Sequence, residues 1–171
     1  SSDKKPEKPV ITNLDEAVLY TDLVQPVLES KCYTCHSSKK QKGKLRLDGQ
    51  EWIEKGGDEG LVLVAHDPSK SPLYERLVLS ELDELHMPPK GKPQPSEAEI
   101  ELIEWWIAQG ASFDQPLQEI AGYAEKKSFL EELVSYEEAP KQSYLPEGEV
   151  TAANLEDLEA LQALGAMVIP V

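Results

Sequence analysis

The chain contains two cysteines, and both lie in the pentapeptide CYTCH, where His36 directly follows Cys35. The spacing of Cys32 and Cys35 places two thiols on one side of a single turn of backbone, with an imidazole next to them. Two thiols so placed can hold one planar group at two points, and the imidazole can bind a metal ion. The pentapeptide therefore constrains the fold more than any other feature, because the chain must form around whatever these side chains hold.

The pattern C-x-x-C-H is typical of covalent haem attachment. Each thiol forms a thioether with a different vinyl group of one haem, and the histidine that follows binds the iron through one ring nitrogen. We expect the other nitrogen of His36 to donate to a backbone carbonyl, which fixes the tautomer. The sequence thus predicts one covalent haem c, attached by Cys32 and Cys35, with its iron bound by His36.

Three other uses of the cysteines are less favoured by the sequence. A thioredoxin-like redox pair starts a helix, whereas the helical pattern here ends at Cys32. A structural zinc site needs four ligands, and a mixed site would have to draw on His36, His66 and His86 as well as both cysteines. A disulfide within C-x-x-C closes almost no loop, so it would stabilise the chain little.

A second axial ligand is expected if the iron transfers electrons. The methionines of the chain are Met87 and Met167, and Met87 lies in LHMPPKGKP. The prolines restrict the backbone, which lowers the entropy cost of holding a weak thioether ligand in place. Met87 is therefore the predicted second ligand, with His86 and His66 as the alternatives.

Helical periodicity dominates the chain, so the predicted fold class is mainly α. Apolar residues from Leu19 onward recur at helical spacing up to Cys32, and a short helix is expected near residues 73–79. Ser96 and Glu99 form a capping-box pattern, which predicts a helix over about residues 97–109. The glycines and prolines between these segments indicate loops.

The composition changes along the chain and suggests four parts. Residues 1–15 are charged and contain two prolines, so we expect a disordered linker. Residues 16–114 are the predicted haem domain, and residues 115–150 a helical extension. Residues 151–171 have leucines at helical spacing followed by an apolar run, which suits either a terminal amphipathic helix or the first unit of a leucine-rich repeat.

The net charge limits the partners that the chain can bind. There are 32 acidic and 17 basic residues, giving a formal charge of −15. This charge opposes nucleic acid and anionic membrane surfaces, and it favours either a basic partner or simply solubility. The sequence has no run of the roughly 18 apolar residues that a membrane-spanning helix needs. Any membrane link is therefore expected through a tether or segment outside this chain.

Several stretches together resemble the planctomycete-type cytochrome c domain, over about residues 22–114. In order, they are VQPVLESKCYTCHSSKKQKGKLRLDG, GG at residues 56 and 57, DPSKSPLYERL, HMPP and SEAEIELIEWWIAQGA. The resemblance implies a compact, class I-like helical cytochrome c fold around one haem c, with His36 and Met87 as axial ligands. It also implies a module of a larger surface or membrane-linked protein. Covalent haem attachment takes place outside the cytoplasm, so a periplasmic or other extracytoplasmic location is expected.

Four more residues are candidates for contact with the haem. Trp105 and Trp106 lie on the capped helix, where core packing is the ordinary role. Lys44 and Arg46 could hydrogen-bond a propionate. The expected function is outer-sphere electron transfer to a redox partner protein, without catalysis. The alternatives are a haem sensor or enzyme with an open iron position, and a zinc-binding structural or interaction module.

Overall fold

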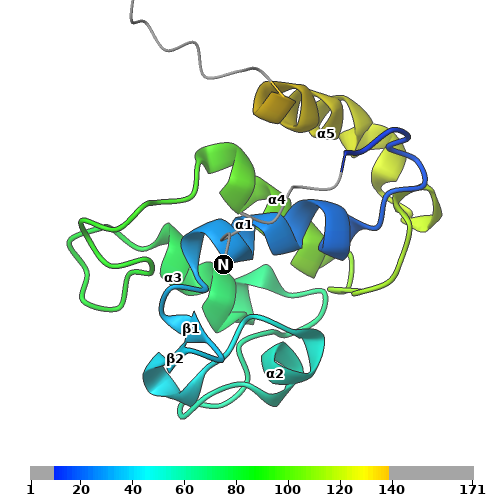
Figure 1. Ribbon diagram of the computed structural model, residues 1–171. Coiled ribbons are helices and arrows are strands. Elements are labelled where there is room, and N and C mark those ends of the chain that lie inside the picture. Colours follow the sequence, from blue (N-terminus) through cyan, green and yellow to red (C-terminus); the bar gives the residue numbers. More distant parts are fainter. Residues whose placement is uncertain (1–9, 139–171) are drawn as a thin grey trace, which may run out of the picture. The chain divides into compact units, whose positions relative to one another are not determined.

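The computed structural model describes residues 10–138, and within this range most of the regular structure is helical (Figure 1). The main elements are a π-helical turn (Leu19–Val24), α1 (Gln25–Lys31), β1 (His36–Ser37), β2 (Lys40–Gln41), α2 (Gln50–Lys55), α3 (Pro72–Val78), α4 (Glu97–Ala108) and α5 (Tyr123–Glu138). Short 3-10 turns lie at Lys42–Lys44, Pro68–Lys70 and Leu117–Glu119. The predicted mainly α fold is confirmed. The prediction for residues 151–171, and Met167 with it, lies outside the described residues.

The first helix carries the cysteines to its C-terminal end, as the sequence predicted. Its π-helical turn runs directly into α1, where Pro26 has no N–H to donate to the preceding turn. Leu23, Val24 and Leu28 bury one face of this helix. Cys32 ends it by donating its backbone N–H to Leu28 O at 2.8 Å.

The capping box that predicted α4 is present. Ser96 Oγ accepts the backbone N–H of Glu99 at 3.1 Å, and Glu99 Oε1 accepts the N–H of Ser96 at 2.9 Å. The helix ends before Gly110, whose φ of +106° is strained for other residues. His66 closes the same end, because its backbone N–H donates to Ile107 O at 2.9 Å and its Nδ1 lies 3.2 Å from Ala108 O.

The core lies where α4 crosses the first helix (Figure 1). At its centre the ring of Trp106, 1% exposed, lies 5.4 Å from the rings of both Tyr20 and Phe113, measured between centroids. The Tyr20 and Phe113 centroids are 4.5 Å apart. The indole N–H of Trp106 donates to Ser112 O at 2.8 Å, so its polar atom is satisfied within the core. Trp105 is also buried, at 7% exposed. No helix among the described residues is long and apolar enough to cross a membrane.

The segment before the first helix is tied to α5. Leu117 N–H donates to Ala17 O at 2.8 Å, and Val18 forms a β-bridge with Pro116. Asp15, at the end of the predicted linker, accepts hydrogen bonds from Tyr123 and Lys127 of α5, at 2.5 and 2.9 Å. These bonds connect the two ends of the described chain.

These two bonds predict a pH dependence for the docking of α5. The hydrogen bonds from Lys127 and Tyr123 hold the pKa of Asp15 below its ordinary value of 3.8. A carboxylate with a lowered folded-state pKa stabilises the folded state above its unfolded-state pKa, and that contribution is lost as the pH falls through the folded-state pKa. The protection of the α5 amides, measured as hydrogen exchange relative to the intrinsic rate at each pH, should therefore decrease below pH 3.8. Asp15→Asn should remove most of this dependence, and an equal loss of protection in the variant would contradict the assignment.

Candidate functional site

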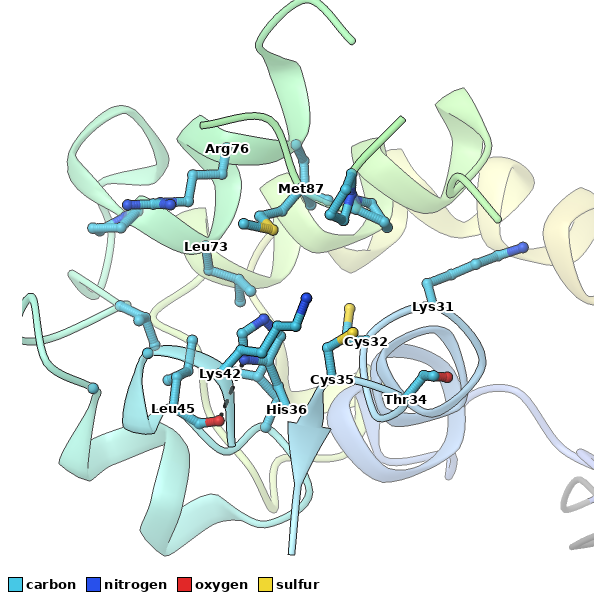
Figure 2. A pocket seen from close by; sticks show the side chains of 18 of the residues that line it. Lys31, Cys32, Thr34, Cys35, His36, Lys42, Leu45, Leu73, Arg76 and Met87 are labelled. Carbon is cyan, nitrogen blue, oxygen red and sulfur yellow. Dashed lines mark hydrogen bonds between the residues drawn. The ribbon is translucent and has the colours of Figure 1, made fainter. Parts of the chain in front are cut away.

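A pocket of about 530 Å³ opens between the two cysteines and α3 (Figure 2). This volume lies within the roughly 300–1,000 Å³ typical of cofactor pockets. The residues that form its apolar walls are Leu45, Leu47, Leu61, Val62, Pro72, Leu73, Leu77, Pro88, Pro89 and Pro93. The same pocket is lined by Cys32, Cys35, His36 and Met87, so the structure brings all four predicted attachment and ligand residues together.

The cysteines lie on a tight turn that continues from α1. The backbone N–H groups of Cys35 and His36 both donate to Cys32 O, at 3.1 and 3.0 Å. Figure 2 shows both sulfur atoms on the pocket side of this turn. Burial raises the pKa of the Cys32 thiol to about 12. A redox-active thiol of the thioredoxin kind needs a lowered pKa, so the site does not favour that chemistry.

The ring of His36 is oriented by Leu45, the predicted backbone carbonyl partner. His36 Nδ1 lies 3.3 Å from Leu45 O, and since a carbonyl only accepts, Nδ1 carries the hydrogen. Nε2 of the neutral ring then keeps its lone pair. Burial lowers the pKa of His36, which favours this neutral form. The imidazole is therefore in the tautomer that a metal ligand requires.

The backbone around His36 is fixed by the small hairpin. His36 pairs with Gln41 across β1 and β2, and its carbonyl accepts the N–H of Leu47 at 2.9 Å. The residues after the hairpin are fixed against the loop that contains Asp58, because Gly43 O accepts the N–H of Asp58 at 2.8 Å. A Cβ on Gly57 would lie 2.7 Å from Gly43 O, so this close approach requires glycine.

Met87 reaches the pocket from the wall opposite His36 (Figure 2). Its backbone N–H donates to Arg76 O at 3.0 Å, which holds the methionine against α3. The two predicted axial ligands thus come from separate parts of the chain and face one pocket.

The two histidines considered as alternatives have other partners. His86 is 5% exposed, and its Nε2 lies 2.8 Å from Gln94 Oε1. His66 lies at the end of α4, as described above. Neither lines the pocket. Among residues 10–138 no group of three or more His, Cys, Asp or Glu side chains could hold a metal ion, so the site does not favour zinc.

The residues proposed for the propionates are not among those that line the pocket. Lys44 is exposed and pairs with Asp58 at 3.1 Å. Arg46 donates from Nε and Nη2 to the two carboxylate oxygens of Asp48, at 2.9 and 3.1 Å, and its guanidinium lies 4.0 Å from the ring centroid of Trp52. Trp105 and Trp106 are likewise absent from the lining and serve the core.

Different cations border the pocket, and sequence reasoning missed them. They are Lys31, Lys42, Arg76 and Lys92. Arg76 also forms an ion pair with Glu59, another lining residue. A signal for Arg76 was present, because it lies three residues after Leu73 and so shares a helical face with it. We call Lys31, Lys42, Arg76 and Lys92 the cationic border.

The pocket residues fit a haem c in every chemical respect that the chain can supply. The space is apolar and is lined by two adjacent thiols, a neutral imidazole and a thioether. The cationic border could bind the propionate carboxylates of a haem. Residues 32–91 match the family model described as planctomycete cytochrome C. Neither the curated proteins nor the solved structures contain a significant match to the chain. The family match agrees with the pocket, because cytochromes c bind haem and its iron covalently.

Proposed function

Because residues 32–91 match the planctomycete cytochrome C family, we propose that the chain is a mono-haem electron-transfer module. In this proposal Cys32 and Cys35 attach the haem, and His36 and Met87 are its axial ligands. One observation carries the proposal: these four side chains line a single apolar pocket, with the two ligand candidates on opposite walls. The reaction is outer-sphere, so the protein needs no catalytic residue of its own.

Each residue contributes a separate property to this function. When bound, haem supplies an iron that cycles between the ferric and ferrous states. His36 offers the lone pair of Nε2, because its Nδ1–H is committed to Leu45 O. The thioether of Met87 favours the ferrous state. The apolar walls exclude water and lower the polarity around the iron, which also affects the potential.

The chemistry of attachment and the charge of the chain guide the proposed setting. Covalent haem attachment takes place outside the cytoplasm, which supports a periplasmic or other extracytoplasmic location. The partner is a redox protein, and a net charge of −15 argues against nucleic acid.

Denaturing mass spectrometry tests the proposal directly. The full chain, expressed with a haem-attachment system, should gain the mass of one haem, and Cys32→Ser/Cys35→Ser should gain none. The reduced protein should also bind carbon monoxide slowly, because Met87 occupies the second axial position. A wild-type mass without haem would overturn the proposal. Rapid carbon monoxide binding would instead indicate an open iron position and a sensor or enzyme.

A further inference from the structure

The loop that carries Met87 is held by a side chain outside the proposed ligand set. Nε2 of Gln94 lies 2.8 Å from Pro88 O, 3.3 Å from Pro89 O and 3.2 Å from Lys92 O. Carbonyl oxygens only accept hydrogen bonds, so this end of the amide must be the NH₂ group. One side chain thus gathers three carbonyls of the same loop.

His86 completes this arrangement from the other side of Gln94. Its Nε2 lies 2.8 Å from Oε1 of Gln94, and an amide oxygen can only accept. His86 Nε2 therefore carries a hydrogen and donates it, which leaves the lone pair of the neutral ring on Nδ1. That Nδ1 is buried and has no hydrogen-bond partner in the described part of the chain.

We propose that His86 and Gln94 form a clamp that keeps Met87 in the ligand position. The clamp is defined as these two side chains with their bonds to each other and to the carbonyls of residues 88, 89 and 92. The inference rests on the proposed function, because it presumes that Met87 is an iron ligand. Both clamp members are positioning residues, and neither contacts the iron.

The placement of the clamp explains how it would act. Met87 is anchored before the prolines by its N–H bond to Arg76 O, and the loop after it is anchored by Gln94. A thioether is a neutral, weak ligand, so the fraction of molecules in which it binds the iron depends on how rarely the loop moves away. Fixing the loop on both sides of Met87 lowers the fraction of molecules in which the sulfur has left the iron.

The unpartnered Nδ1 of His86 allows an experiment to distinguish a positioning role from a purely structural one. A buried polar atom without a partner destabilises a fold, so an apolar side chain at position 86 would pack without that loss. What an apolar side chain cannot supply is the N–H that orients Gln94. His86→Leu should therefore weaken retention of Met87 without lowering the midpoint of thermal unfolding, which a purely structural histidine would not do.

The test measures how readily added imidazole displaces Met87 from the ferric, haem-loaded chain. Gln94→Glu keeps the size of the side chain and an acceptor for His86, but it replaces the donor by an oxygen that repels the loop carbonyls. The apparent Kd for imidazole falls as the fraction of molecules with a displaced methionine rises. We expect a Kd at least roughly tenfold lower in Gln94→Glu, Gln94→Ala and His86→Leu, because each variant loses at least one hydrogen bond of the clamp.

Two further variants serve as controls. Gln50→Ala removes a glutamine on α2 whose amide donates to Glu54, and it should leave the Kd unchanged. His86→Gln restores an N–H donor and should return the Kd to within about threefold of the wild-type value.

The outcomes distinguish failure of the clamp from failure of the proposed function. An unchanged spectrum in Met87→Ala would end the ligation proposal and the clamp with it. A changed spectrum in Met87→Ala, together with a wild-type imidazole Kd in Gln94→Glu and His86→Leu, would overturn the clamp alone. If Gln94→Ala does not fold, those two variants decide the question, since neither creates a cavity of that size.

Discussion

Replacing Met87 with alanine is expected to lower the reduction potential by roughly 100 mV, because a thioether ligand stabilises ferrous haem and alanine provides no ligand. Such a fall corresponds to roughly a fiftyfold change in the redox equilibrium, at about 59 mV per factor of ten for one electron. The ferric spectrum should lose its sulfur-to-iron charge-transfer band. Potentiometric titration and absorption spectroscopy of the haem-loaded protein measure both effects.

The second methionine of the chain provides a matched control. Met167→Ala removes the same side chain at a position that the proposed function does not use, so potential and spectrum should remain those of the wild type. If Met87→Ala retains the wild-type potential instead, the ligand role passes to a histidine. His86→Ala and His66→Ala would then show which one, through the variant whose spectrum changes.

Replacing Trp106 with alanine should produce the largest loss of stability among the core positions. The side chain is 1% exposed, contacts the rings of Tyr20 and Phe113, and donates its N–H to Ser112 O. Truncating such a residue leaves a cavity and lowers the free energy of unfolding by about 3–5 kcal/mol. Urea denaturation followed by circular dichroism measures this change.

Trp52 is the control for this effect. It lies on α2, is half-buried, and meets the guanidinium of Arg46 at its face. Trp52→Ala should lower the free energy of unfolding by only about 1 kcal/mol, from the loss of the cation–π contact and some apolar burial. Equal losses in the two variants would contradict the assignment of Trp106 as the centre of the core.

The elements that the sequence predicted well have local signals. The capping box at Ser96 and Glu99 depends on residues three apart, and it placed α4 within one residue of its observed end. The missed elements lack such signals. The strands β1 and β2 have two residues each and form because they pair with one another, while α2 is a single short helix between glycines. The glycines in this region indicated loops, whereas tertiary packing stabilises a short helix and a small hairpin.

The residues of the candidate site also differ in whether the sequence carries a local signal for them. Cys32, Cys35 and His36 are adjacent in sequence, so a motif is enough to propose them. Met87 could be proposed from the stiffness of its proline-rich loop. Gln94 could not, because its contacts are made with the carbonyls of a loop whose shape is set by folding, and the signal for Arg76 was only its helical spacing from Leu73. A positive charge near the motif was an insufficient guide.

Lys44 is an example of a basic residue whose orientation cannot be predicted from its position in the sequence. Its backbone has a φ of +52°, in the left-handed region, and its ammonium group is directed to Asp58. Arg46 is two residues further along, and its guanidinium is held by Asp48 and Trp52. Neither orientation can be read from the spacing of the basic residues, since both depend on carboxylates and a ring placed by the surrounding loops.

Lys31 and Lys42 of the cationic border belong to a longer basic segment. Residues 31–46 contain six of the 17 basic residues and no acidic residue, so the remainder of the chain holds 11 basic against 32 acidic residues. Net charge sets how strongly the molecule as a whole is attracted or repelled, whereas an uneven distribution of charge sets which segment turns toward a charged surface. Near a negatively charged surface this segment, which carries both cysteines, is attracted while the remainder of the acidic chain is repelled. The preference depends on ionic strength, because physiological salt screens charges over about 8–10 Å.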